Sequence, residues 1–517
     1  MSHRVLARLA AGAGLKAWVA AGLVLASAVA VSAASSDAHA ATSSPGRISW
    51  FYKPPTDGTH SSQVAARHAE VVLTGRADLG FRDRLRQAGY AGRVWNYVEQ
   101  PFASAPLDNP CGAFGVWWDL WDNQVAWEHQ VGVPGSNDFC RYIHRNESWM
   151  LHRPSDGSRL TRRADNQTQY YMNPGSTGWR EWFATRVARD QASWRYDGLF
   201  LDDLWSNNGR HGGFREYAST GAYEQAVIGF IQHLKSRNPG LRVIGNTENP
   251  EVYSPALDGW MYEAFGGWWW NRYQPEQDVL RLWQLAERDS AAGKDIFLIS
   301  QGDRGDTRKL RFSYAAYLMV ANDRVSFRYS NVSSYRQYWD YPEYRVALGR
   351  PVGARRNVGG SAWRRDFEGG TVLVNLSAST AQRIRLDSTF RTAEGVAATS
   401  VMLLPQTGLL LLRATGARTA AAPATGTQAQ QRGSAANRPL RSFTPVARRL
   451  RARGVDVERY LWRRPAVRRA YRIAGARWSG QRFYTRPALA RWLDARGRSY
   501  RTWARRNPAQ AQRLVVY

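Results

Sequence analysis

Short apolar runs of β type alternate with helical patterns from Ile48 to about Tyr329, and this alternation constrains the fold more than any other feature. A strand followed by a helix and then another strand is typical of β/α units, whose strands form a parallel sheet. The candidate strands are residues 48–52, 71–75, 93–98, 148–152, 199–204, 242–246, 259–265 and 296–301. Eight is the number of strands that closes a barrel.

Apolar residues between these runs recur at three- and four-residue spacing, as they do along helices that bury one face. The predicted helices are residues 79–87, 179–191, 223–235, 276–292 and 308–320. The sequence therefore predicts an α/β fold, a (β/α)8 TIM barrel over residues 47–335. The loop after the third strand is unusually long and holds both cysteines.

The sequence changes character after the barrel. Residues 355–413 lose the helical period and alternate as strands do, which predicts a small C-terminal antiparallel β-sandwich domain. Residues 414–439 are rich in Ala, Thr, Gly and Gln and predict a flexible linker. In residues 440–517, Leu450-Arg-Ala-Arg-Gly454 returns as Leu493-Asp-Ala-Arg-Gly497, so this tail is predicted to be a basic helical repeat module.

Residues 1–40 have the pattern of a cleaved signal peptide. Arg4, Arg8 and Lys16 precede an apolar stretch, and Ala38-His-Ala40 offers small residues to signal peptidase. The apolar stretch is short for a membrane span, which needs about twenty residues. We expect a bacterial protein that is secreted or associated with the cell wall and has no transmembrane segment after cleavage.

The chain has only two cysteines, Cys111 and Cys140, both in the long third loop. In an oxidising compartment a disulfide between them is favoured over two free thiols. The nine histidines show no zinc-type spacing, and there is no Cys-x-x-Cys, Gly-x-Ser-x-Gly or phosphate-binding glycine loop. We expect no metal and no organic cofactor. We therefore expect the reactive groups to be carboxyl groups of Asp and Glu.

The formal net charge of +29 is unevenly distributed. Residues 440–517 hold 21 arginines and three acids, so more than half of the excess lies in this tail. Its arginines alternate with aromatic residues, as they do in single-strand nucleic-acid binders, but the expected export argues against nucleic acid as a partner. An anionic cell-envelope polymer fits the expected location better.

The chemistry-bearing feature of the barrel is an apolar strand that ends in two acids. Residues 198–204 read Gly-Leu-Phe-Leu-Asp-Asp-Leu, which places Asp202 and Asp203 at the carboxyl end of a buried parallel strand. Reactive groups of TIM barrels lie at those ends. Because side chains alternate along a strand, only one of the two can point into the barrel mouth. The structural alternative is a helix cap or a surface acid.

Glu263 ends a second strand of the same design, about sixty residues later. It lies between Tyr262 and Phe265, where burial would raise its pKa and suit it to hold a proton near neutrality. The structural alternative is an inward acid paired with one of the many arginines. Two carboxyl groups that face each other are what glycosidic-bond hydrolysis requires.

Sugars have apolar faces and polar edges, so a carbohydrate site needs aromatic platforms and amide hydrogen-bonding groups. The chain has 23 tryptophans, several of them in segments that follow strand ends, although packing is the usual role of any one. The candidate substrate-binding residues are Asn96, Trp118, Asn173, Trp205, Asn246, Tyr262, Trp268 and Gln301.

Three of these motifs resemble those of a known group of proteins. Tyr196-Asp-Gly-Leu-Phe-Leu-Asp202, the asparagine-tipped strand at Asn246 and Leu257-Asp-Gly-Trp-Met-Tyr-Glu263 resemble the TIM-barrel endo-α-1,4-polygalactosaminidases and the glycosyl hydrolases related to them. The resemblance covers about residues 47–335 and implies that Asp202 and Glu263 are the catalytic pair. It also implies a bacterial or fungal exopolysaccharide as substrate, with galactosamine as one candidate component. Asp203 departs from the family pattern, in which a small or amide residue is common at that position.

The sequence therefore predicts a secreted glycoside hydrolase that cleaves a polysaccharide with an Asp/Glu pair. Asp202 is the predicted nucleophile or base, Asp203 its partner or substitute, and Glu263 the acid. The competing hypothesis is a non-catalytic glycan-binding protein of the cell envelope, anchored by its basic tail.

Overall fold

The structure is a computed structural model that describes residues 46–107, 109–113, 130, 132–164, 167–204, 206, 212–268, 273–392 and 395–414, and short stretches between 443 and 514. The chain divides into two compact units, residues 1–417 and 418–517. The predicted signal peptide and nearly all of the predicted linker lie outside the described residues.

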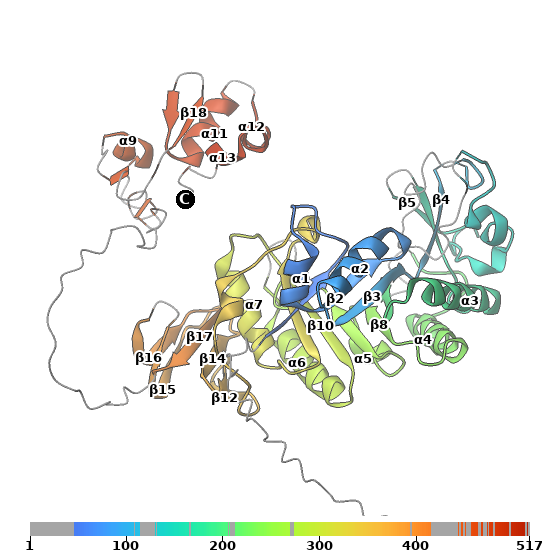
Figure 1. Ribbon diagram of the computed structural model, residues 1–517, viewed down its shortest axis with the longest axis horizontal. Coiled ribbons are helices and arrows are strands. Elements are labelled where there is room, and N and C mark those ends of the chain that lie inside the picture. The colour runs from blue at the N-terminus through green and yellow to red at the C-terminus, as the bar shows by residue number, and fades with distance from the viewer. Residues whose placement is uncertain are drawn as a thin grey trace, which may run out of the picture. The chain divides into compact units, whose positions relative to one another are not determined.

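Eight parallel strands close into a barrel in the first unit, with helices around them (Figure 1). This confirms the predicted TIM barrel. In order around the barrel the strands are β1 (Arg47–Phe51), β2 (His68–Thr74), β3 (Arg93–Glu99), β7 (Gly198–Asp202), β8 (Val243–Asn246), β9 (Gly259–Tyr262), β10 (Asp295–Gln301) and β11 (Val325–Ser330).

One of the eight predicted strands was wrong. Residues 148–152 do not enter the barrel, because Met150 and His152 form only isolated antiparallel bridges with Met172 and Arg159. The eighth barrel strand is β11, which pairs with β10 and β1 and closes the ring. Its inward side carries Ser326, Arg328 and Ser330, so the sequence alternates and lacks the continuous apolar run of a doubly covered strand.

The five predicted helices are found close to their predicted positions, as α2 (Leu79–Gln87), α3 (Thr177–Trp194), α4 (Thr220–Arg237), α6 (Glu276–Ala291) and α7 (Thr307–Leu318). Two short helices, α1 (Ser61–Arg67) and α5 (Pro250–Tyr253), were not predicted. The boundaries follow local chemistry: the Ser219 hydroxyl accepts from the Ala222 amide at the start of α4, and the Asp306 carboxylate accepts from the Lys309 amide at the start of α7.

The barrel interior shows which side chains of each strand point inward. Phe51, Val72, Trp95, Tyr97, Phe200, Ile244, Met261, Phe297 and Ile299 form one buried cluster inside the ring. Their sequence neighbours Leu199, Leu201 and Trp260 pack outward in the clusters shared with the helices. Because the period along a strand is two, residues 202, 246, 263 and 301 continue the inward set at the carboxyl ends of β7 to β10.

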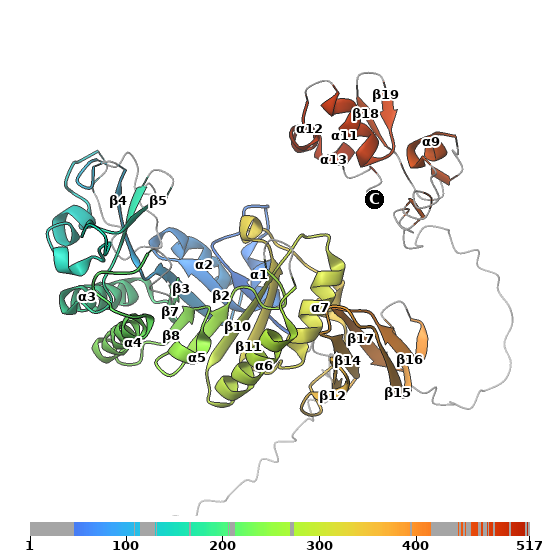
Figure 2. The same cartoon turned by 180° about the vertical axis from the view of Figure 1, so that it is seen from behind.

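The long loop after β3 forms a separate small sheet beside the barrel, near α3 (Figure 2). Its strands are β4 (Phe102–Pro106), β5 (Thr161–Ala164) and β6 (Gln167–Tyr171), paired antiparallel in the order β4-β6-β5. Cys111 and Cys140 form a disulfide in this insertion, with Cα atoms 5.1 Å apart, which confirms the predicted pairing.

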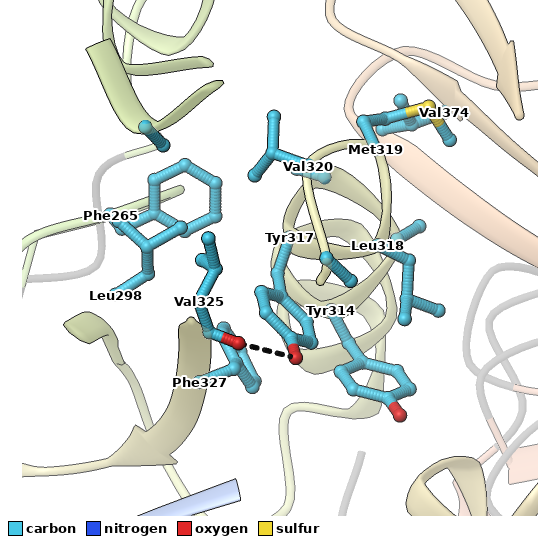
Figure 3. Close-up of a cluster of buried hydrophobic side chains, with 14 of the residues drawn as sticks. Phe265, Leu298, Tyr314, Tyr317, Leu318, Met319, Val320, Val325, Phe327 and Val374 are labelled. Atoms are coloured by element: carbon cyan, nitrogen blue, oxygen red, sulfur yellow. Dashed lines mark hydrogen bonds between the residues drawn. The ribbon is translucent and has the colours of Figure 1, made fainter. Parts of the chain in front are cut away.

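The C-terminal part of the first unit is a six-stranded antiparallel sheet that packs on α7. Its strands are β12 (Arg356–Gly359), β13 (Ala362–Phe367), β14 (Gly370–Asn375), β15 (Gln382–Arg391), β16 (Ala397–Leu403) and β17 (Thr407–Arg413). Val372, Val374 and Leu410 join the barrel-side core, in which α7 lies between sheet and barrel (Figure 3). Leu373, Leu411 and residues of β15 and β16 form a second core on the other face.

Tyr317 on α7 links these layers through its hydroxyl. That hydroxyl donates to the Val325 carbonyl on β11 at 3.2 Å and accepts from the Arg47 amide on β1 at 2.8 Å (Figure 3). These bonds tie α7 to two barrel strands, while Val372, Val374 and Leu410 of the β domain pack in the same apolar cluster as α7.

Asp295 stabilises the end of the barrel opposite the strand tips. It is buried at the start of β10, and its carboxylate receives Arg93 at 2.7 Å, Arg242 at 2.6 Å and Arg324 at 3.2 Å. These arginines come from three other β/α units, so one acid ties the barrel base together. Acids on that face of a TIM barrel serve stability and not catalysis.

The second unit contains α9 (Val457–Trp462), β18 (Ala476–Trp478), β19 (Gln481–Phe483), α11 (Arg486–Asp494), α12 (Tyr500–Arg506) and α13 (Pro508–Ala511). Among the residues of this unit that the structure describes, β18 and β19 form an antiparallel hairpin that the sequence did not indicate. Of all the helices described, none is long and apolar enough to cross a membrane.

Candidate active site

Four polar side chains meet at the carboxyl ends of neighbouring barrel strands. Asp202 ends β7, Asn246 ends β8, Glu263 directly follows β9, and Gln301 ends β10. Each lies two residues after an inward apolar side chain, so the strand period aims all four into the barrel mouth. The fold thus brings together residues that are up to one hundred positions apart in sequence.

Asn246 connects the two acids. Its side-chain Nδ2 donates to Asp202 Oδ1 at 2.7 Å and to Glu263 Oε2 at 3.1 Å. The two carboxylate oxygens can therefore be no farther apart than the sum of these two distances. One amide nitrogen holds both acids in a fixed relation across the barrel mouth.

Glu263 receives two further hydrogen bonds on its other oxygen. Tyr335 OH donates to Glu263 Oε1, and Gln301 Nε2 donates to the same atom at 3.2 Å. The backbone of Tyr335 is held in place by Arg328 on β11, whose buried guanidinium donates to the Tyr335 backbone carbonyl at 2.6 Å. These donors leave Glu263 little freedom to rotate.

Asp202 is held on its second oxygen by the Tyr97 hydroxyl. The Tyr97 ring on β3 stacks on Phe200 at 5.7 Å and on Tyr52 at 4.8 Å, so the hydroxyl has a fixed position. Aromatic packing inside the barrel thereby sets the orientation of the carboxylate.

Burial raises the pKa of both acids, but the charges around them differ. The pKa of Asp202 is raised by burial, while hydrogen bonds from Tyr97 and Asn246 oppose the rise. The pKa of Glu263 is raised by burial and, in addition, by the negative charge of Asp202; hydrogen bonds from Tyr335, Asn246 and Gln301 oppose it. The negative charge of Asp202 thus favours the protonated form of Glu263.

Replacing Tyr335 by phenylalanine tests how its hydrogen bond affects the pKa of Glu263. The variant loses a hydrogen bond that favours the ionised form of Glu263, so the pKa of Glu263 should rise further. If the protonated form is the active one, the alkaline limb of the pH profile of kcat should move to higher pH. An alkaline limb that stays in place or moves to lower pH would contradict this role of Tyr335.

A pocket of about 240 Å³ opens beside Glu263 and Asp203, next to Asp202 in sequence. Besides Asp203, Asn246, Glu263 and Gln301 it is lined by Leu204, Thr247, Glu248, Tyr262, Ala264, Trp268 and Val332. The mixture of acids, amides and aromatic side chains suits a sugar, whose faces are apolar and whose edges are polar. Predicted residues Asn246, Tyr262, Trp268 and Gln301 therefore lie together in one pocket.

Two predicted substrate contacts lie elsewhere, in structural roles. Asn96 points away from the barrel interior, and its Oδ1 accepts from the Gly75 amide at 2.9 Å, because it is one residue out of phase with inward Trp95 and Tyr97. Asn173 closes a turn by accepting from the Gly175 amide at 2.9 Å. Trp118 and Trp205 lie outside the described residues.

Sequence reasoning missed several residues around the acids. Tyr97 could have been predicted as a site residue, since it is near the end of a predicted strand. Tyr335 follows the strand that was missed, so nothing placed it near Glu263. Glu99, at the tip of β3 and paired in register with Asp202, is buried and accepts from Gln169 Nε2 of the insertion at 3.0 Å.

Comparison with known protein families gives one match that includes the acids. Residues 120–371 match the family described as "Hypothetical glycosyl hydrolase family 15". The matched stretch contains Asp202, Asn246, Glu263 and Gln301. This part of the chain is a glycoside hydrolase domain. The match confirms the predicted enzyme class and the resemblance to glycosyl hydrolases.

Solved structures similar to this chain include the glycoside hydrolase domain of PelA from Pseudomonas aeruginosa, at 18% identity and a TM-score of 0.36, covering 57% of this chain and 96% of that one. Another is the maltogenic α-amylase AmyB from Thermotoga neapolitana, at 10% identity and a TM-score of 0.41, covering 72% of this chain and 99% of that one. A comparison with curated proteins finds no match.

Proposed function

We propose that the protein hydrolyses a polysaccharide, with Asp202 as the nucleophile and Glu263 as the general acid and base. The observation that carries the proposal is the Asn246 amide that bonds both acids at once. This arrangement holds the two carboxyl groups close together at the barrel mouth.

The separation of the acids favours retention of anomeric configuration. Inverting glycosidases keep their carboxyl groups about 6.5–9.5 Å apart to admit a water, whereas retaining enzymes keep them about 5–5.5 Å apart. The bonds through Asn246 hold the nearest oxygens of Asp202 and Glu263 below the inverting range. Asp202 is thus close enough to attack the sugar directly.

The steps follow from the roles of the two acids. Glu263 gives its proton to the departing glycosidic oxygen while an Asp202 oxygen bonds to the anomeric carbon, and the carbon–oxygen bond to the leaving sugar breaks. Glu263, now ionised, takes a proton from water. The resulting hydroxide displaces Asp202 and restores both acids.

Several features support a polymeric substrate outside the cytoplasm. The pocket is open to the surface and has Tyr262 and Trp268 on its lining, which suits one unit of a longer glycan. The Cys111–Cys140 disulfide fits an oxidising compartment, in agreement with the predicted signal peptide. The family resemblance suggests a bacterial or fungal exopolysaccharide, and galactosamine polymers belong among the candidates.

A screen of the mature protein tests the proposal. The panel contains bacterial exopolysaccharides and cell-wall glycans, including α-1,4-linked galactosamine polymers, with reducing-end release as the readout. We expect release from at least one polymer by the wild-type chain and none by Glu263→Gln. Binding of a glycan without release from any polymer would favour the alternative, a glycan-binding protein of the cell envelope.

For residues 418–517 we propose a role in attachment to an anionic envelope polymer. Two of the three acids of this arginine-rich part serve the fold: Asp456 caps α9 through the Arg459 amide, and Glu458 accepts from the Tyr484 amide at 2.7 Å. Trp462, close to them in sequence, is 66% exposed.

A chain ending at Ala417 tests this role. It should lose salt-sensitive binding to cell walls and keep the turnover of the full chain. Equal wall binding by the shortened and the full chain would refute the role.

A further inference from the structure

Asp203 has an unusual backbone conformation for its position. Its φ is +56°, in the left-handed region, and only three other described non-glycine residues, Lys53, Arg195 and Gln406, share a positive φ. Residues other than glycine are strained in this conformation, and strained residues are often found at functional sites. The residue lies directly between the nucleophile and Leu204, whose amide bonds the Asn246 carbonyl at 3.0 Å.

This conformation explains where the side chain lies. In an extended strand Asp203 would point away from the barrel interior, opposite to Asp202. The left-handed turn ends the strand, and Asp203 lines the same pocket as Glu263 and Asn246, with its side chain 29% exposed. The strained backbone of Asp203 thus places a third carboxyl group at the pocket.

We propose that Asp203 is a specificity-determining residue that donates a hydrogen bond to the sugar bound between Asp202 and Glu263 and takes no part in breaking the bond. This rests on the proposed hydrolase function. The carboxyl group acts in its neutral form, as an acid that holds a substrate hydroxyl or ring substituent in place.

The charged groups around Asp203 favour this neutral form. Burial and then the nearby carboxylates of Asp202 and Glu99 hold its pKa well above the usual value, and Glu263 adds to the effect. A neutral carboxyl group can donate a hydrogen bond, which a carboxylate cannot.

Arg162, a cation that faces Asp203, only partly offsets these acids. Arg162 on β5 has its Nη2 4.0 Å from Asp203 Oδ2, longer than a hydrogen bond. Its Nε donates to Gln169, and its guanidinium lies over the Phe102 ring at 3.8 Å. The insertion sheet thus holds Arg162 in place beside Asp203 without a close ion pair.

The experiment compares Asp203→Asn, Asp203→Gly and Arg195→Gly in the full chain, on the panel polymer that the wild-type chain cleaves fastest. Asparagine tolerates a left-handed backbone and still donates, so kcat/KM should stay within about threefold of wild type and the pH profile should be unchanged in shape. Glycine removes both the strain and the donor. We expect kcat/KM to fall about tenfold, mainly through KM, and the melting temperature to rise by about 1–3 °C.

Arg195→Gly is the matched control, because Arg195 caps α3 with φ +53° and is exposed. It should raise the melting temperature in the same way and leave kcat/KM unchanged. Loss of activity in Asp203→Asn as deep as in Asp202→Asn would overturn the proposal, because it would make an ionised Asp203 essential. Wild-type kcat/KM in Asp203→Gly would overturn it as well.

The outcome separates the two proposals. If Asp202→Asn and Glu263→Gln keep their activity, the proposed hydrolase mechanism fails. If these two variants are inactive and both Asp203 variants behave like wild type, only the role of Asp203 fails.

Discussion

Replacing Asp202 by asparagine should lower kcat by about 10⁴-fold or more, the scale of loss seen when a catalytic nucleophile is removed. Asparagine has the size of aspartate and can still meet the Asn246 side chain, but it cannot form the bond to the anomeric carbon. The measurement is the initial rate of reducing-end release at saturating polysaccharide. A loss below about tenfold would remove Asp202 from the reaction.

Asp295→Asn is the matched control for this variant. Asp295 is also a buried acid of a barrel strand, but it lies at the opposite end and is surrounded by Arg93, Arg242 and Arg324. Removing its charge leaves three arginines facing one another and should destabilise the fold by about 3 kcal/mol. Its kcat, measured below the melting transition, should equal that of the wild type. The two variants together separate loss of chemistry from loss of fold.

Replacing Glu263 by glutamine should lower kcat by about 10²–10⁴-fold, because the leaving oxygen is no longer protonated. Glutamine can still accept from Tyr335 and Gln301, so glycan binding should persist. The comparison is between kcat from reducing-end release and the affinity for the same polymer. Undiminished turnover would show that Glu263 is not the acid.

The same variant should also change stability in a pH-dependent way. The pKa of Glu263 in the folded protein is raised above its ordinary 4.5, so the folded state is penalised as pH rises above the unfolded value. Glutamine cannot ionise and removes that penalty. The melting temperature of Glu263→Gln should exceed that of the wild type near neutrality and match it in acid, below the unfolded pKa. A lower melting temperature near neutrality would mean that Glu263 is needed for folding.

Much of the barrel could be predicted from the sequence, because its helices and most of its strands carry strong periodic signals. The spacing of apolar residues placed α2 and α6 almost to the residue. β11 was missed because polar residues interrupt its apolar run: Arg328 is buried in this strand, with its guanidinium over the Trp50 ring at 4.3 Å. A local pattern cannot reveal a side chain whose environment is built by distant strands.

The site could be predicted only in part, for a related reason. A strand ending in two acids shows that one faces inward, but which one depends on whether Phe200 or Leu201 fills the barrel, and that is a property of the closed ring. Asn96 was misplaced by the same one-residue ambiguity. The left-handed conformation of Asp203, which returns it to the pocket, has no signal in the sequence, since neither glycine nor a turn motif marks it.

The residues that hold the acids were harder still to predict. Tyr97 and Tyr335 act through hydroxyl groups at the ends of aromatic side chains that otherwise pack in the core, and their partners are more than seventy residues away. Glu99 meets Gln169 from an insertion whose position depends on the folded barrel. Such contacts follow from topology and not from spacing along the chain.

The most direct test of the central claim is the anomeric configuration of the first product, followed by proton NMR during early hydrolysis of the polymer that the screen identifies. Asp202 and Glu263, held through Asn246 at a separation shorter than an inverting pair allows, predict a product with the configuration of the substrate bond. A first product of the opposite configuration would contradict the account, because a water and not Asp202 would then have attacked the sugar.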